Sequence, residues 1–178
     1  MTQSETNAGA SGSPFWRFSL RFYRMPGVAD ACIVLQDEAG VDVNLLLFLL
    51  WNARMDRVLS RADVEGLESR VAEWRDRVVI PLRDVRRQLK SPPALVDKSA
   101  AEALRTRIKQ AELEAERLQQ EGLFALAESS PPGRPAVSPE EAARDNVLAY
   151  QAMKGVTFPP AALGTVFSAF EELAARAD

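Results

Sequence analysis

Residues 15–51 form a stretch rich in aromatic and apolar side chains, and this stretch limits what the chain can fold into more than any other segment. It contains four of the eight phenylalanines, two of the three tryptophans and an unbroken apolar run of six residues, 45–50. A run of that length is too short to cross a bilayer, which takes about 20 apolar residues. We therefore expect it to lie in the central helix of a folded core.

The first helix of the domain is predicted to begin at Ser13 and Pro14, because serine is a good N-cap and proline is well tolerated at the first helical position. Apolar residues then follow on two adjacent faces as far as the pair Pro26 and Gly27, which should end the helix. The remaining side carries three arginines at helical spacing: Arg17, Arg21 and Arg24. We call these the arginine row and expect it to face solvent.

A junction between two further helices is predicted at residues 40–42. Gly40 follows a helix over about 28–38 and stands where a C-terminal glycine in the left-handed conformation is common. Asp42 precedes a helix over about 43–55 and can accept a hydrogen bond from a backbone amide in its first turn. That helix is apolar nearly all round, so we expect other helices to cover it.

Two long amphipathic segments follow, over residues 61–90 and 99–128. The apolar stripe of the first segment is Val64, Leu67, Val71, Trp74, Val78, Leu82, Val85 and Leu89. The stripe of the second is Leu104, Ile108, Ala111, Ala115, Leu118, Gly122 and Ala125. Pro81 should kink the first helix, and Ser99 should cap the second. The short connection with Pro92 and Pro93 predicts an antiparallel helical hairpin.

The remainder of the chain is predicted to be a linker loop over 129–137 and two helices, 139–153 and one that begins at Pro159 and Pro160. No segment alternates with a period of two residues over a useful length, so we predict no sheet. The fold class is all-α, with six or seven helices. Residues 1–13 are expected to be a disordered tail. Residues 14–178 should form one domain, with a core from 14–57 and 138–177 and a long hairpin from 61–128.

Composition excludes several classes of function. The chain has 22 basic and 25 acidic residues, a formal charge of −3, which disfavours non-specific nucleic-acid binding. It has no histidine and one cysteine, so a histidine general base, an intrachain disulfide and a zinc site built from these residues are excluded. The first residues lack the pattern of a signal peptide, and no segment is expected to span a membrane. We expect a cytoplasmic protein.

The only dense polar group inside the apolar stretch comprises Gln36, Asp37, Glu38, Asp42 and Asn44. One interpretation is a site where carboxylates hold a divalent cation. The spacing does not fit a calcium-binding loop, however, because Gly40 is the fourth residue from Asp37, not the sixth. The interpretation that we favour is structural, with these residues capping and satisfying the ends of helices. We predict no metal, no cofactor and no catalytic residue.

A second candidate surface is basic. Arg83, Arg86 and Arg87 cluster near the end of the first long helix, and together with the arginine row they could bind an anion or an acidic partner. Charged residues on an amphipathic helix usually face solvent. Neither group is interleaved with aromatic residues that could stack on bases, so nucleic acid is an unlikely partner.

An apolar ligand between the helices is a third possibility. A cavity for a lipid-like or quinone-like molecule would be lined by aromatic residues of the stretch: Phe15, Trp16, Phe18, Phe22, Phe48 and Trp51. Aromatic residues at helical spacing more often form a core, which is the alternative.

The stretch FWRFSLRFYRMPGVADACIVLQDEAGVDVNLLLF resembles a family of small helical proteobacterial proteins with the signature FWxFSLxxYxxPGVxxACxxLQDxxGxDVNLLLF. The resemblance is strong over about the first 40 residues of the predicted domain, and the rest of the chain matches only in general character. It implies a bacterial protein of an uncharacterised family, and it implies no particular chemistry.

Three functional hypotheses follow. The first is a non-catalytic interaction or adaptor protein, which binds a protein partner or a second copy through residues 64–126. The second is a binder of an apolar small molecule. The third is an enzyme that depends on carboxylates. We favour the first, because the chain offers long amphipathic helices and lacks the usual catalytic motifs.

Overall fold

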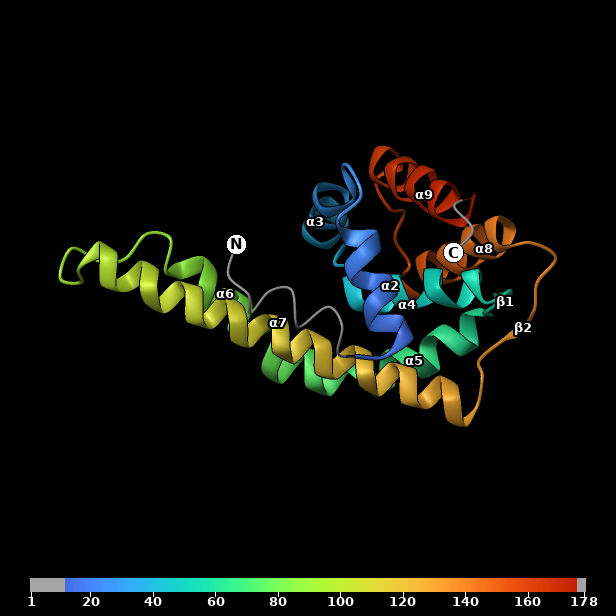
Figure 1. Cartoon of the computed structure of the whole chain (residues 1–178), viewed down its shortest axis with the longest axis horizontal. Helices are drawn as coiled ribbons and strands as arrows, with labels where there is room; N and C mark the ends of the chain where they lie inside the picture. Colours follow the sequence, from blue (N-terminus) through green and yellow to red (C-terminus); the bar gives the residue numbers. More distant parts are fainter. Residues whose placement is uncertain (1–11, 176–178) are drawn as a thin grey trace.

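The apolar helix α4 (Val43–Arg54) lies in the middle of a helical body, with other helices packed around it (Figure 1). The computed structural model describes residues 12–175, so residues 1–11 of the predicted tail over 1–13 lie outside the described part, as do residues 176–178. In α4 all six residues of the run 45–50 are at most 3% exposed. The central position predicted from the apolar run is therefore confirmed.

The described chain is almost wholly helical. Its elements are α2 (Pro14–Tyr23), α3 (Val28–Ala39), α4, β1 (Arg57–Val58), α5 (Arg61–Trp74), η1 (Arg75–Val79), α6 (Ile80–Gln88), α7 (Lys98–Ser129), β2 (Arg134–Pro135), α8 (Pro139–Lys154) and α9 (Pro160–Ala175). With α5, η1 and α6 counted as one continuous helix, the described part has seven helices. The all-α prediction is confirmed.

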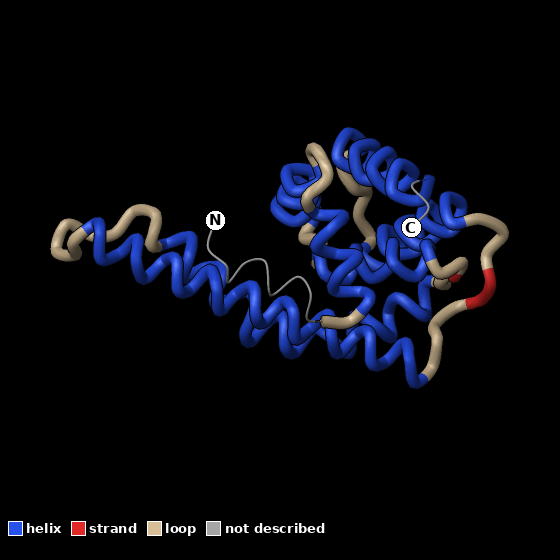
Figure 2. Tube along the Cα trace, in the orientation of Figure 1, coloured by secondary structure: helices blue, strands red, loops and turns tan. Residues whose placement is uncertain are grey.

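The long hairpin is formed by α6 and α7, and its far end projects from the body as an arm (Figures 1 and 2). We use "arm" for residues 80–118 and "body" for the rest. The hairpin does not stand apart from the core along its whole length. Val64, Leu67 and Val71 of α5 and Leu123 of α7 belong to the buried apolar cluster of the body. The base of the hairpin is therefore part of the core, and only its outer turns extend beyond it.

A π-helical turn, η1, interrupts the first long helix just before Pro81. Pro81 has no N–H and its ring crowds the preceding turn, so a disturbance of the helix here was expected. A π turn takes in one residue more than an α turn, which shifts the buried face by one position. Val79 is consequently buried at 1% exposure, whereas the regular repeat predicted Val78.

The predicted apolar stripe of α7 coincides with its buried face only in part: Ala115 is buried and Ile108 is half-buried. Leu104 and Leu118 are 39% and 47% exposed, and Ala111, Gly122 and Ala125 are exposed as well. The buried residues are Ala101, Glu112, Ala115, Gln119, Gln120, Leu123 and Ala127. Three of these are polar and have hydrogen-bonding partners, which a search for apolar periodicity cannot detect. The prediction of Ser99 as N-cap was also wrong: Asp97 caps the helix, and its Oδ1 accepts from the N–H of Ala100 at 2.8 Å.

A two-stranded antiparallel sheet corrects the prediction of no sheet, and it ties down the predicted linker. β1 pairs with β2, Arg57 with Pro135 and Val58 with Arg134. The Arg57 side chain also donates to the carbonyl oxygens of Pro131, Pro132 and Gly133, at 3.1, 2.9 and 2.6 Å. Strands of two residues have no detectable alternation, so only the pairing between residues 76 and 78 positions apart reveals them.

Gly133 allows this close contact. Its φ of +68° suits glycine, and a Cβ placed there would lie 2.1 Å from the Val58 carbonyl oxygen. We expect Gly133→Ala to separate β1 from β2 and to speed cleavage within residues 129–137 by a broad-specificity protease. The matched control is Gly66→Ala in α5, where the added Cβ meets no atom within 4 Å and should stabilise the helix by about 0.5–1 kcal/mol. Equal cleavage of both variants would contradict this account.

Candidate functional site

Asp42 is the residue at which the polar contacts of the body converge. Its Oδ1 accepts hydrogen bonds from the backbone N–H groups of Asn44 and Leu45, at 2.9 and 3.3 Å, which caps α4. Gly40, just before it, has φ +61° and ends α3. The junction predicted from the sequence is therefore confirmed in its geometry, and the capping explains why an aspartate stands beside an apolar helix.

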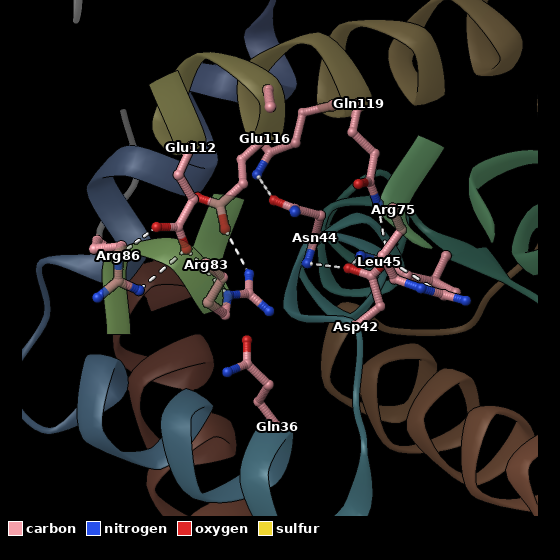
Figure 3. Close-up of polar contacts among 12 residues, drawn as sticks. Gln36, Asp42, Asn44, Leu45, Arg75, Arg83, Arg86, Glu112, Glu116 and Gln119 are labelled. Carbon is pink, nitrogen blue, oxygen red and sulfur yellow. Dashed lines mark hydrogen bonds and ion pairs between the residues drawn. The ribbon is translucent and has the colours of Figure 1, made fainter. Parts of the chain in front are cut away.

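Asp42 also contacts three other helices, two of them through Gln119 and Arg75 (Figure 3). Gln119 of α7 donates from Nε2 to Asp42 Oδ2 at 2.8 Å, and Arg75 Nη1 lies 3.6 Å from the same oxygen. The backbone N–H of Asp42 donates to the hydroxyl of Tyr150, in α8, at 2.9 Å. Burial raises the pKa of Tyr150, and the nearby Asp42 charge raises it further, so the hydroxyl stays protonated. The aspartate thus links α4 to η1, α7 and α8.

Asn44 belongs to the same set of buried polar contacts. We call this set the polar layer, and its members are Asp42, Asn44, Arg75, Gln119, Gln120 and Tyr150. Asn44 Oδ1 accepts from Gln120 Nε2 at 2.8 Å, so two successive glutamines of α7 each bind one polar side chain at the start of α4. The side-chain amide oxygens of the two glutamines, Oε1 of Gln119 and of Gln120, are buried and have no hydrogen-bond partner within the described part. Together these contacts explain why polar residues face the core along α7.

Arg75 is held by acidic residues on its own helix. Its Nη1 contacts Glu68 Oε1 at 2.7 Å and its Nε contacts Asp76 Oδ1 at 2.9 Å. Burial alone would lower the pKa of Arg75, but the hydrogen bonds with Asp76 and Glu68 raise it above its ordinary value. Arg75 therefore stays charged beside Asp42 and balances the buried carboxylate.

Two arginines of the predicted basic cluster, Arg83 and Arg86, are neutralised by α7 (Figure 3). Arg83 contacts Glu112 at 3.1 Å and Glu116 at 2.8 Å, and Arg86 contacts both oxygens of Glu112. Burial would raise the pKa of Glu112, but hydrogen bonds from Arg86 and Arg83 lower it below its ordinary value. The four side chains join the two helices of the hairpin.

The pKa of Glu116 moves the other way, because burial raises it more than Arg83 lowers it. Carboxylates with opposite pKa shifts can divide the roles of acid and base in an enzyme. Here, however, Arg83 binds both carboxylates and comes from the same hairpin as they do. The arrangement therefore joins α6 to α7. A metal ion is a separate question: the described residues contain no cluster of three or more His, Cys, Asp or Glu placed to hold one.

Asp37 and Gln36 lie where α3 approaches α6. Arg87 Nη2 contacts Asp37 Oδ1 at 2.9 Å, and this hydrogen bond lowers the pKa of Asp37. Gln36 also donates to Asp37, at 3.2 Å. Both side chains of the ion pair are nearly half exposed, so the contact adds little to stability. The structure thus separates Gln36 and Asp37 from Asp42 and Asn44, which the sequence had grouped together.

The arginine row divides as well. Arg17 and Arg21 border a surface pocket together with Arg54 from the end of α4, whereas Arg24 does not. The predicted aromatic cavity is largely filled: Phe15, Phe22 and Phe48 are completely buried. Phe15 and Phe48 stack edge to face, with ring centroids 5.1 Å apart, as is usual in a core. Only Phe18 and Trp51 of the predicted set line the pocket.

Sequence reasoning missed several residues of this site: Glu68, Arg75, Glu112, Glu116, Gln119, Gln120 and Tyr150. The available signal was weak. Glu112 and Glu116 are one helical turn apart, as are Arg83 and Arg87, and such spacing on two adjacent amphipathic helices suggests ion pairs between them. The two glutamines carried no comparable signal, because their partners are 75 or more residues away in the sequence.

Removing the Asp42 carboxylate tests the junction. Asp42→Ala loses the α4 cap and the Gln119 contact, and we expect a loss of about 1–3 kcal/mol, seen as a lower Tm in thermal melting. Asp42→Asn keeps the capping oxygen, and its amide can donate to Gln119 Oε1 if that side chain turns, so the loss should be much smaller. A melting curve of Asp42→Asn as low as that of Asp42→Ala would show that the charge, not the cap, is essential.

The ion pairs of Glu112 with Arg83 and Arg86 predict that the stability of the fold depends on pH. Because the folded-state pKa of Glu112 lies below its ordinary value of 4.5, its stabilising effect is complete above that value and is lost as the pH falls through the folded-state pKa. Glu112→Gln should therefore lower the free energy of unfolding at pH 7 by about 1–3 kcal/mol, which is measured as a lower Tm. Below pH 4.5 the difference in Tm between this variant and wild type should become smaller.

Glu114→Gln is the matched control for Glu112→Gln, since Glu114 pairs with Arg117 on the surface of the same helix at 56% exposure. It should change Tm very little at either pH. A constant difference between Glu112→Gln and wild type across the pH range would contradict a role for the carboxylate charge.

Among residues 12–175, no helix combines the length and hydrophobicity needed to cross a bilayer. No curated protein and no solved structure matches the chain. A family described as "Protein of unknown function (DUF2390)" matches residues 14–123. The match begins at the start of α2 and ends within α7, six residues before the end of that helix. This range includes the whole polar layer between α4 and α7 except Tyr150. The chain therefore belongs to this family of unknown function, as the signature stretch predicted.

Proposed function

We propose that this chain is a non-catalytic interaction protein that pairs with a second copy of itself along the outer face of α7. The observation that carries the proposal is a row of exposed residues spaced by seven, which we call the exposed stripe: Leu104, Ala111, Leu118 and Ala125. Seven residues are close to two turns of an α-helix, so the row follows one face over about 30 Å.

The arm, which carries Leu104, Ala111 and Leu118 of the stripe, is rich in exposed apolar side chains. Of the 14 large apolar side chains exposed in the described part, seven lie in the arm, which is less than a quarter of the chain. Exposed apolar groups in a continuous row favour association, because burying them removes apolar surface from water. The arm also projects beyond the body, where a second molecule can reach it (Figure 1).

The stripe is complementary to itself when reversed. Consider two antiparallel copies of α7 related by a two-fold axis that passes midway between residues 114 and 115. Leu104 of one copy then lies opposite Ala125 of the other, and Ala111 lies opposite Leu118. Large side chains thus meet small ones, which permits close packing. A two-fold arrangement is closed and yields a dimer.

Two leucines on α7 provide a matched test. Leu118 and Leu113 are equally exposed, at 47% and 48%, but five residues turn them about 140° apart around the helix. We expect wild type to sediment as a dimer, Leu118→Asp to raise the dimer dissociation constant about tenfold or more, and Leu113→Asp to leave it nearly unchanged. A strictly monomeric wild type, or equal effects of the two variants, would overturn self-pairing.

Cross-linking defines the orientation. The only native cysteine, Cys32, is completely buried, and burial raises the pKa of its thiol to about 12, so it should not react. Ala111→Cys combined with Leu118→Cys should yield covalent dimers with a short bismaleimide, whereas Leu113→Cys should not. Efficient linkage through position 113 would show that the copies meet on a different face.

A further inference from the structure

The far end of the arm presents an apolar turn to solvent (Figures 1 and 2). The N–H of Val96 donates to the Pro93 carbonyl oxygen at 2.9 Å, which closes a turn with Ala94 and Leu95 at its corner. Leu95 is 97% exposed, the highest value among the exposed large apolar side chains of the described part, and Val96 is 43% exposed. The turn is therefore available to a partner outside this chain.

This end of the molecule is also basic. We use "outer arm" for residues 83–112, which run from one member of the Arg83–Glu112 ion pair to the other. The outer arm contains eight basic and four acidic residues, whereas the remaining residues of the chain contain 14 basic and 21 acidic ones. The chain as a whole has a formal charge of −3, so its excess of positive charge is confined to the part that projects.

Half of the basic side chains of the outer arm are exposed and form no ion pair with another residue of the range 12–175: Lys90, Lys98, Arg107 and Lys109. The first two stand on either side of the turn, five residues before Leu95 and three residues after it. The acidic residue of the same loop, Asp97, accepts from the N–H of Ala100 and caps α7. Unpaired positive charge therefore flanks the exposed leucine.

We propose that the end of the arm docks on the surface of an anionic lipid bilayer. Leu95 and Val96 enter the boundary between headgroups and acyl chains, and Lys90 and Lys98 contact the lipid phosphates. Proteins bind bilayer surfaces through this combination, because the burial of apolar side chains and the attraction to anionic lipids both favour binding.

A nucleic acid would match the charge of the outer arm but not its apolar turn. Residues 89–98 offer no aromatic ring on which a base could stack, and Leu95 would have no role. The turn also lies outside the exposed stripe of α7, which begins at Leu104. Docking is therefore independent of self-pairing, and each can fail without the other.

Vesicle flotation with the full chain tests the docking. Vesicles of phosphatidylcholine and phosphatidylglycerol, mixed about two to one, should bind the protein, and vesicles of phosphatidylcholine alone should bind it about tenfold more weakly. Leu95→Asp should reduce the affinity for the mixed vesicles about tenfold or more. Val137→Asp is the matched control and should stay within about twofold of wild type, since Val137 is 91% exposed but lies between β2 and α8 in the body. No binding to the mixed vesicles, or equal affinities of the two variants, would overturn the proposal.

Charge variants test the two lysines. Lys90→Gln combined with Lys98→Gln should weaken binding to the mixed vesicles about tenfold or more. Arg24→Gln combined with Arg70→Gln is the matched control, because it removes the same charge from exposed positions of the body. Both double variants should sediment as wild type does, which separates a loss of docking from a loss of self-pairing. An equal loss of binding in both would show that the vesicles respond only to overall charge, and would overturn the proposal.

A duplex oligonucleotide distinguishes the other anionic partner. We expect it to bind wild type about tenfold more weakly than the mixed vesicles do at the same salt concentration. An oligonucleotide that binds as tightly as the vesicles, with an affinity that Leu95→Asp leaves unchanged, would overturn docking on a bilayer in favour of nucleic acid.

Discussion

The buried carboxylate of Asp42 is the interaction on which the arrangement of helices depends. A charged group at 8% exposure is costly unless it is fully bonded, and here its oxygens bind two backbone amides and Gln119, with Arg75 close by. Each of these partners comes from a fixed place on a helix. The direction in which α7 passes α4 is therefore set by a requirement to satisfy one charge, as well as by apolar packing.

This requirement explains the uneven character of α7. Near the body its inner face carries Gln119 and Gln120, which bond to Asp42 and Asn44, and farther out it carries Glu112, which bonds to Arg83 and Arg86. Polar groups on the inner face leave apolar residues on the outer face, where the exposed stripe lies. The stripe and the polar layer are thus two sides of one helix, and the proposed pairing follows from the way in which the layer is satisfied.

Asn146 performs a comparable task at the other end of the core. It is completely buried, accepts from the N–H of Leu59 at 2.7 Å and donates to the carbonyl oxygens of Leu49 and Arg57. Through these hydrogen bonds Asn146 connects α8 to Leu49 in α4, to Arg57 in β1 and to Leu59 directly after β1. Nothing in the sequence around residue 146 distinguishes this asparagine from a surface residue of an amphipathic helix, because its partners are nearly 90 or more residues away.

The sequence by itself determined the local features. Helix boundaries, the cap at Asp42, the glycine ends at Gly40 and Gly155 and the central place of the run 45–50 all follow from interactions within a few residues, and the chain carries them in its order. Tertiary structure decided which face of α7 is buried, which acidic residues neutralise the arginines of α6, and that residues 134–135 pair with 57–58. These depend on hydrogen bonds and charges brought together from distant segments, and apolar periodicity along one helix does not encode them.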